Sequence, residues 1–367
     1  MINSLKAFFV LISTIIGLGV FMLPYVFVNS GYVFFIWMFL IVIVMFLIHL
    51  MIGEILLQTS AKHNLPSLAA IYLSPKLKNI VWFNDYLGML GIFFIYLIVL
   101  GKLWSSILPV DAIYIKLVFV LLNIIFLVKN FLIFSRFESV LSLLIIALFI
   151  ILAAVMFNHF NFNNLYYSFF NIQNFWLPYG IMIFAFSGNS ALPLVYDLVG
   201  KDKKKFFYVN LIALLVVAFL YLLYTIAVVG FLGINVSEES LNSLRDYLGD
   251  VFFVLAVLLV TLNITFVDMA FYLKRGLIYD YSLSPTKANI FLSLCILSLI
   301  FIDSSQIVFL ANVVSSLFVG FNFFIICLIY LKLKQKLYFN LSKIIIFLLM
   351  TIFLSGICYS LYSILIN

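Results

Sequence analysis

The chain has 367 residues, of which 67% are hydrophobic and 9% are charged. Soluble domains contain about 45–50% apolar and about 25% charged residues, so a water-soluble core is excluded and lipid must surround most of this chain. The formal net charge of +7 lies mostly at the ends of apolar stretches. That distribution indicates membrane topology and argues against nucleic acid as a partner.

A helix needs about 20 residues to cross the hydrocarbon of a bilayer. Cutting the chain at its polar clusters leaves eleven apolar stretches with no long polar segment between them. We therefore predict an all-α integral membrane protein with a single transmembrane domain over residues 1–367. The eleven predicted transmembrane helices are 7–28, 32–57, 80–101, 112–128, 139–157, 175–199, 206–233, 251–273, 288–302, 307–331 and 341–366.

The basic residues are distributed unevenly between the two sides of these spans. With the N-terminus in the cytoplasm, only Lys102, Lys116 and Arg245 of the 20 lysine and arginine residues lie outside. The positive-inside rule then predicts an N-terminus inside and a C-terminus outside. We expect a multi-pass protein of the cytoplasmic membrane.

Two distant spans carry the same short interruption. Residues 19–24 read Gly-Val-Phe-Met-Leu-Pro, and residues 188–193 read Gly-Asn-Ser-Ala-Leu-Pro. Glycine and proline within a span free backbone N–H and C=O groups that hydrocarbon cannot satisfy, so such breaks occur where they line a cavity. The breaks fall in the first helices of two sets of five spans, 7–157 and 175–331, with 341–366 as an extra helix. This pattern predicts an inverted 5+5 repeat whose breaks meet at a substrate site.

The backbone groups freed at the two breaks suit the two ends of a zwitterion. The half-helix that begins after the first break exposes N–H groups, which bind a carboxylate. The half-helix that ends at the second break exposes carbonyl groups, which suit an ammonium group or a metal cation. The alternative is that the glycines only permit close helix packing and the prolines are ordinary kinks. The candidate substrate-binding residues, with the two phenylalanines as an aromatic gate and the tyrosine as a cap, are Ile16, Gly17, Leu18, Gly19, Tyr96, Phe184, Phe186, Ser187, Gly188, Asn189 and Ser190.

Three short stretches resemble a known family. Residues 16–25, Ile-Gly-Leu-Gly-Val-Phe-Met-Leu-Pro-Tyr, resemble the first-helix signature of the amino acid/auxin permease family and of the related bacterial aromatic amino acid permeases. Residues 183–193, Ile-Phe-Ala-Phe-Ser-Gly-Asn-Ser-Ala-Leu-Pro, resemble the sixth-helix signature, with Asn189 where many members have histidine. Glu54 resembles an acid near the inner end of the second helix in the bacterial branch. The first-helix signature also occurs more widely in the amino acid/polyamine/organocation superfamily.

This resemblance implies the leucine-transporter-like fold with broken helices 1 and 6, a secondary active mechanism and amino acid substrates. It does not extend to proton coupling through the histidine that Asn189 replaces. In the fold that the chain resembles, the eighth helix lies against the broken first helix, and that junction often holds sodium. Here Thr261, Thr265 and Asp268 share one face of the eighth span.

Together with oxygen atoms around Ser13 and Ile16, this face would form an all-oxygen cation site. The alternative is that the hydroxyl groups bond their own helix backbone and that Asp268 forms an ion pair near the inner interface. The fifth span has no lysine to supply a fixed positive charge, which favours sodium as the coupling ion. A proton is the alternative coupling ion, because Asp268 and Glu54 are present and a desolvated carboxyl group can titrate near neutral pH. Glu54 is a candidate gate residue or proton carrier, or else an acid at the interface.

The remaining polar residues give no support for catalysis. The three cysteines lie inside spans without metal-ligand spacing, and no nucleophile–base pair or phosphate-binding motif is present. We assign Asp85, at the end of a span, to a helix start or a loop, and the lone His49 to hydrogen-bonded packing.

We therefore predict a secondary transporter, not an enzyme, that needs no cofactor beyond a coupling ion, Na⁺ or H⁺. It would move a neutral amino acid, with aromatic and large apolar side chains among the candidates, by alternating access. The alternative function is a membrane sensor of the same fold, such as a spore-germination-type receptor subunit, which binds an amino acid without moving it.

Overall fold

The computed structural model describes residues 2–59, 64–128, 135–166, 171–200, 202–262, 265–333 and 338–366. Within its helices the side chains of residues 2, 135–139, 166, 262 and 265–268 lie outside that description. The described residues form helices and connecting loops, without a strand. The helices are α1 Ile2–Ile15, α2 Gly19–Ser30, α3 Val33–Gln58, α4 Leu65–Tyr72, α5 Leu77–Ser105, α6 Ala112–Val128, α7 Ser135–Phe157, α8 Asn163–Tyr166, α9 Leu177–Phe186, α10 Leu192–Leu198, α11 Lys203–Leu232, α12 Arg245–Leu248, α13 Asp250–Leu262, α14 Thr265–Tyr279, α15 Pro285–Ser298, α16 Ile307–Val314, α17 Gly320–Leu331 and α18 Lys343–Ile366.

Seven of the described helical segments are long and apolar enough to cross a membrane, or up to eight when the bent pair α1 and α2 counts as one span. Three shorter apolar helices lie in 112–128, 250–261 and 285–301. The prediction of a helical, multi-pass membrane protein is therefore confirmed. A total of eleven spans requires that the three shorter helices also cross the membrane. That number stays a prediction.

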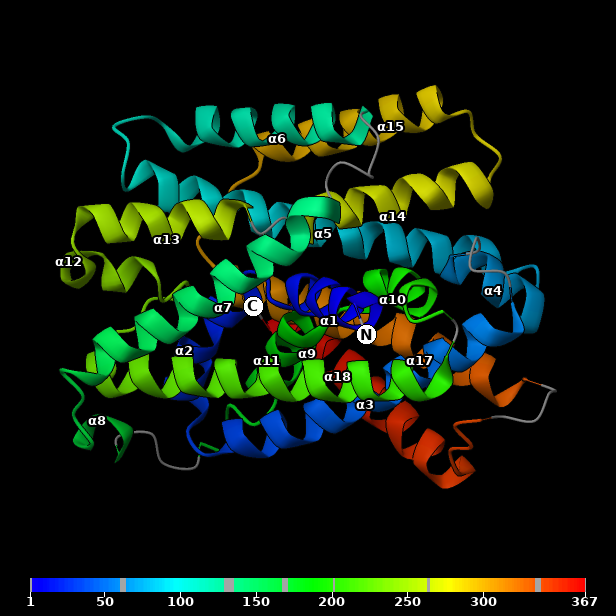
Figure 1. The fold of residues 1–367 in the computed structure, drawn as a ribbon, viewed down its shortest axis with the longest axis horizontal. Coiled ribbons are helices and arrows are strands. Elements are labelled where there is room, and N and C mark those ends of the chain that lie inside the picture. Colours follow the sequence, from blue (N-terminus) through cyan, green and yellow to red (C-terminus); the bar gives the residue numbers. More distant parts are fainter. Residues whose placement is uncertain are drawn as a thin grey trace.

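Both interrupted spans are broken where the sequence predicts. The helices α1 and α2 meet at an angle of 55°, and α9 and α10 are separated by Ser187, Gly188 and the short 3-10 helix η2 Asn189–Ala191. The four half-helices pack on one another, α2 on α9 and α1 on α10. In Figure 1 α1, α9 and α10 lie in the middle of the molecule, between α5, α13 and α14 on one side and α11 and α3 on the other. The breaks are thus enclosed by longer helices.

The two ends of the bundle differ. The helices α8 and α12 lie at one end in Figure 1, and α4 lies at the opposite end. At the α4 end, α11 begins with a well-formed cap, because the Asp202 carboxylate accepts hydrogen bonds from the backbone N–H groups of Lys204 at 3.0 Å and Lys205 at 3.1 Å. These hydrogen bonds hold the pKa of Asp202 below its usual value, and the bond from the Lys205 backbone has the largest effect.

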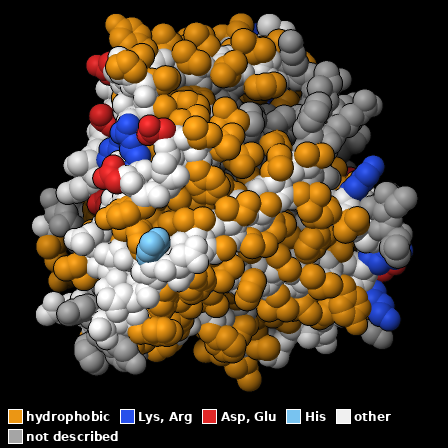
Figure 2. Space-filling view, turned by 60° about the vertical axis from the view of Figure 1, so that its left-hand side comes forward, with side chains coloured by type: hydrophobic (Ala, Val, Ile, Leu, Met, Phe, Trp, Pro, Cys, Tyr) orange, Lys and Arg blue, Asp and Glu red, His pale blue; other side chains and the backbone are white. Residues whose placement is uncertain are grey.

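The surface has the character of a lipid-facing protein. Figure 2 shows hydrophobic side chains spread over most of one face, with charged side chains gathered toward its two sides. The side chains of Phe39, Phe219 and Val251 are 73%, 63% and 77% exposed. Exposed apolar patches on this scale are rare on soluble monomers and mark a surface that another apolar phase covers.

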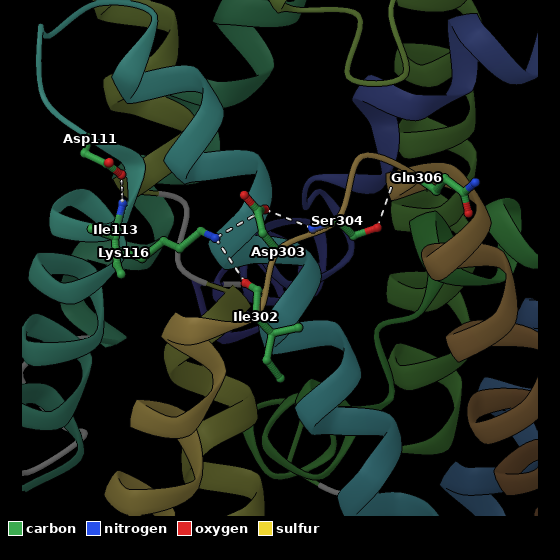
Figure 3. A network of polar contacts seen from close by, with 7 residues as sticks. All are labelled: Asp111, Ile113, Lys116, Ile302, Asp303, Ser304 and Gln306. Atoms are coloured by element: carbon green, nitrogen blue, oxygen red, sulfur yellow. Dashed lines mark hydrogen bonds and ion pairs between the residues drawn. The ribbon is translucent and has the colours of Figure 1, made fainter.

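The buried Lys116 side chain connects the outer helix α6 to the rest of the bundle. The Lys116 ammonium on α6 lies 3.3 Å from a carboxylate oxygen of Asp303 and donates to the Ile302 carbonyl at 3.2 Å (Figure 3). Asp303 and Ile302 belong to the connection between η4 Leu299–Phe301 and α16. A buried ammonium is costly unless it is paired, so this contact fixes where α6 lies against the second half of the chain.

The orientation predicted from the basic residues can be tested at two exposed positions. In a variant whose three cysteines are replaced by alanine, we expect Asp246→Cys to react with a membrane-impermeant maleimide in intact cells and Lys204→Cys to react only after permeabilisation. Both side chains are exposed, whereas the nearby Glu239 is only 6% exposed and a poor reporter. The reverse labelling pattern would contradict an N-terminus inside.

Candidate functional site

The first break is held open by hydrogen bonds to its neighbours. The helix α1 ends where Ile16 N–H donates to the Ile12 carbonyl at 2.9 Å. The next turn is irregular, and the Leu18 N–H lies 3.4 Å from the Tyr96 hydroxyl of α5, which accepts a hydrogen bond from it. The helix α2 then begins at Gly19, and its first N–H groups have no partner within the helix.

The second break begins where Ser187 adopts an extended backbone conformation. Ser187 has φ −72° and ψ 113°, which ends α9. The Ala191 N–H returns to the Gly188 carbonyl at 3.2 Å. Pro193 lies in the first turn of α10, where its missing N–H costs nothing.

A single tyrosine joins the two breaks. The Tyr221 hydroxyl of α11 lies 3.0 Å from the Ile15 carbonyl and 2.9 Å from the Ala185 carbonyl, and it donates to this pair. These carbonyls belong to the last turns of α1 and α9, which lack helical partners at the breaks. Tyr221 is fully buried. The chain has 21 tyrosines, and nothing in the sequence distinguishes Tyr221 from the others. Sequence analysis therefore missed it.

Two of the predicted glycines allow close contact between the broken spans. A Cβ atom on Gly19 would lie 2.7 Å from the Ala185 Cα, and a Cβ atom on Gly188 would lie 2.6 Å from the Ile15 Cγ1. The structure thus supports the packing interpretation of Gly19 and Gly188. Packing and ligand binding are compatible here, because close approach is what brings the two breaks to one cavity.

A cavity of about 110 Å³ lies at the breaks. Seven of the eleven candidate substrate-binding residues line it, from both broken spans and from α5. The other four lie beside it: Ile16 and Leu18 line a smaller adjoining cavity, Phe186 packs on Tyr221, and Gly188 packs on Ile15. The seven that line the main cavity are Gly17, Gly19, Tyr96, Phe184, Ser187, Asn189 and Ser190.

The two breaks bring different polar groups to the cavity. The side-chain oxygen of Asn189 is buried and has no hydrogen-bond partner among the described residues. It belongs to the second break, whereas the start of α2 belongs to the first. An unsatisfied buried acceptor is costly, so this oxygen favours a bound donor.

The cavity extends toward the α4 end, where Asn64, Asp85, Tyr272 and Asn322 line it. Asp85 lies neither at a helix start nor in a loop, so that prediction is wrong. It lies well inside α5, is only 5% exposed, and accepts a hydrogen bond from Asn322 Nδ2 at 2.9 Å. Sequence analysis put Asp85 near the start of the predicted span 80–101, whereas α5 begins three residues earlier, at Leu77, and carries Asp85 into the buried part of the helix.

The opposite end of the cavity is closed. The Phe21 carbonyl of α2 accepts hydrogen bonds from the Ser240 backbone at 2.9 Å and hydroxyl at 2.6 Å. The Tyr224 hydroxyl lies 2.9 Å from the same serine oxygen, and the rings of Phe21 and Tyr224 meet edge to face. The loop that carries Ser240 therefore seals the bundle on the α12 side.

Two of the candidate ion-coupling residues have hydroxyl groups that bond within their own helices. Thr261 donates to the Val257 carbonyl at 2.7 Å and accepts from Trp104 Nε1 at 2.9 Å, and it is absent from the described lining of the main cavity. The Ser13 hydroxyl donates to the Val10 carbonyl of its own helix at 3.0 Å. The side chains of Thr265 and Asp268 lie outside the described residues.

Glu54 and His49 also lie away from the cavity. The Glu54 carboxylate accepts the backbone N–H groups of Tyr338 and Phe339, each at 3.2 Å, and so fixes the connection that leads to α18. His49 Nδ1 lies 3.1 Å from the Asn210 side-chain oxygen. Because Asn210 Nδ2 donates to the Phe206 carbonyl, the histidine is the donor in this pair. Its assignment to hydrogen-bonded packing fits this geometry.

A helical membrane bundle with two broken spans around a shared cavity has the architecture of a transporter. The fold is similar to that of MhsT in the crystal structure of that protein in complex with L-phenylalanine, with a TM-score of 0.64 and 16% sequence identity over 98% of each chain. The family profile described as transmembrane amino acid transporter protein matches residues 1–273. The chain belongs to this family, which confirms the predicted resemblance and a transporter class distinct from enzymes. No curated protein has significant sequence similarity to the chain.

The bridging hydroxyl gives a prediction for stability. Tyr221→Phe leaves the carbonyls of Ile15 and Ala185 without their shared donor, and we expect it to lower the free energy of unfolding by about 1–3 kcal/mol. The matched control is Tyr208→Phe on the same helix, since Tyr208 is 50% exposed. The midpoint of thermal unfolding in detergent should fall for the first variant only. Equal midpoints for both would show that the bridge does not stabilise the breaks.

Proposed function

We propose that this protein is a secondary active transporter that moves a neutral amino acid across the cytoplasmic membrane by cation-coupled alternating access. The observation that carries the proposal is one cavity lined by both helix breaks, with Gly17 and Gly19 from the first break and Asn189 and Ser190 from the second. Eleven spans in an inverted 5+5 repeat, with the N-terminus inside and the C-terminus outside, complete the proposal.

The polar groups of the two breaks favour opposite ends of an amino acid. The N–H groups at the start of α2, together with the positive end of the helix dipole, would bind the carboxylate. The Asn189 oxygen and the carbonyl groups at the end of α9 would accept from the ammonium group. Charge-assisted hydrogen bonds of this kind are roughly twice as strong as neutral ones.

The walls between these groups favour an apolar side chain. Phe184, Ile92 and Val319 line the cavity near the breaks. The described lining there carries no charged side chain, so a neutral amino acid fits it best. MhsT was crystallised with L-phenylalanine, which supports aromatic and large apolar amino acids as candidate substrates of this chain.

The cavity corresponds to one state of an alternating-access cycle. It extends toward the α4 end, and the contact of Phe21 with Ser240 closes the other end. With the N-terminus inside, the α4 end faces the cytoplasm and the state is inward-facing. The broken helices would rock against the remaining spans to open the α12 side.

The coupling ion is proposed to be sodium, bound near the junction of the first and eighth spans by Ser13, Ile16 and Thr265. The hydrogen bonds of Thr261 to Trp104 and Val257 favour a structural task for that residue. Asp268 remains the proposed proton site if coupling is to H⁺. Glu54 is held by two backbone N–H groups, which favours a structural task over a gate.

Counterflow in proteoliposomes tests this function. We expect labelled amino acid to accumulate against an excess of unlabelled substrate inside, and more slowly without sodium. Asn189→Leu should lower the affinity about tenfold or more, because a buried charge-assisted hydrogen bond is lost. Asn123→Leu is the matched control, since that asparagine also has an unpaired buried oxygen among the described residues but lies on α6, away from the cavity.

Two outcomes would contradict the proposal. Substrate binding without counterflow would favour the alternative function, an amino-acid sensor of the same fold. Equal affinities for both asparagine variants would show that the breaks are not the substrate site. Unchanged rates in sodium-free buffer would overturn the sodium assignment alone.

A further inference from the structure

The α4 end of the cavity contains a buried acid that the proposed substrate site does not use. Asp85 is the only charged side chain among the described residues that line the cavity. It is 5% exposed. Burying a carboxylate costs several kcal/mol unless it is paired or well hydrogen-bonded, so in an otherwise uncharged cavity this acid needs partners.

Neutral groups hold this carboxylate in a fixed orientation. Asn322 Nδ2 of α17 donates to it at 2.9 Å, and the Tyr272 hydroxyl of α14 is a second hydrogen-bond partner. Asn322 is itself oriented, because Asn84 Nδ2 donates to its side-chain oxygen at 3.0 Å and to the Phe318 carbonyl at 2.9 Å. Such a preorganised set is typical of a binding group.

No described basic residue neutralises Asp85. The charged side chain that acts on it electrostatically is Asp280, after α14, which repels it. The Lys78 ammonium, from the start of α5, donates to the Asp280 backbone carbonyl and lies over the Tyr281 ring. The Lys274 ammonium of α14 donates to the Leu127 carbonyl at 2.7 Å. The ion pairs among the described residues do not include Asp85, so its charge is left for a ligand.

A substrate bound at the breaks does not reach this acid with its α-ammonium group. Tyr96, which contacts the first break, lies eleven residues after Asp85 on α5, a rise of about 16 Å along the helix. In an amino acid the ammonium group is two bonds from the carboxylate carbon. Asp85 therefore belongs to a second position along the same cavity.

We propose that Asp85 forms a second subsite that binds the α-ammonium group of the amino acid after it leaves the helix breaks. Asn64 supplies a further acceptor oxygen, because its Nδ2 donates to the Tyr272 carbonyl at 2.9 Å. The apolar side chains of Ile55, Leu68 and Met89 line the cavity around it and accommodate the substrate's side chain. This inference rests on the proposed amino acid transport.

An ammonium group fits this subsite better than a metal cation. Asn322 and Tyr272 turn donors toward the carboxylate, so few oxygen acceptors remain free. Hard metal cations require a nearly complete shell of oxygen ligands. An ammonium group has three N–H donors and is satisfied by one carboxylate, one amide oxygen and water.

The test uses n-butylamine, a primary ammonium with no carboxylate, which lacks the group that the breaks would bind. Calorimetric titration of the purified protein in nanodiscs should show that Asp85→Asn weakens amine binding about tenfold or more. Binding of the transported amino acid at the breaks should change less than about threefold, which also shows that the variant is folded. Asp111→Asn, the same change at an exposed acid, is the matched control and should bind the amine as the unaltered protein does.

Adding Asn322→Asp to the Asp85→Asn variant returns a carboxylate to the same hydrogen bond and should restore part of the amine affinity. Equal amine binding with and without Asp85, or no amine binding to the unaltered protein, would overturn the subsite. Displacement of the amine by sodium at constant ionic strength would also overturn it and favour a metal cation. Failure of the unaltered protein to bind any amino acid would instead contradict the proposed function itself.

Discussion

The Tyr221 hydroxyl, within 3.0 Å of the Ile15 carbonyl and 2.9 Å of the Ala185 carbonyl, is the interaction on which the centre of the molecule depends. Hydrocarbon offers no partner for a backbone group, and each unsatisfied one costs several kcal/mol. Two broken helices side by side therefore need donors and acceptors from other helices. Tyr221 supplies the donor for the carbonyls at the ends of α1 and α9. Tyr96 supplies an acceptor for the Leu18 N–H.

The position of the cavity follows from this constraint. With the ends of α1 and α9 held on one hydroxyl, the contacts of Gly19 with Ala185 and of Gly188 with Ile15 bring the two breaks together. The donors at the start of α2 then face the acceptors near Asn189. A π-helix at Ser315–Val319 follows α16, and irregular helical turns of this kind are frequent at functional sites. It places Val319 and, three residues later, Asn322 on the cavity wall.

The sequence predicts the breaks well, because glycine and proline weaken a helix wherever they fall in a long apolar run. It predicts individual partners poorly. Tyr221 cannot be distinguished from other tyrosines, since its task depends on which carbonyls lie opposite it in space. Asp85 was assigned to a helix start or a loop because it lies near the beginning of the predicted span 80–101, but α5 begins earlier, at Leu77, and buries Asp85 within it. Helical periodicity put Thr261 and Thr265 on one face, but it could not show that Trp104 would occupy the Thr261 hydroxyl.

The central claim is that one amino acid lies between the two helix breaks, and a structure of the protein with its bound substrate tests it most directly. Cryo-electron microscopy in nanodiscs, with saturating amino acid, should show the carboxylate beside the N–H groups at the start of α2. The ammonium group should lie beside the Asn189 oxygen and the last carbonyls of α9. Density for the amino acid elsewhere in the molecule, with the cavity at the breaks empty under saturating conditions, would contradict the account.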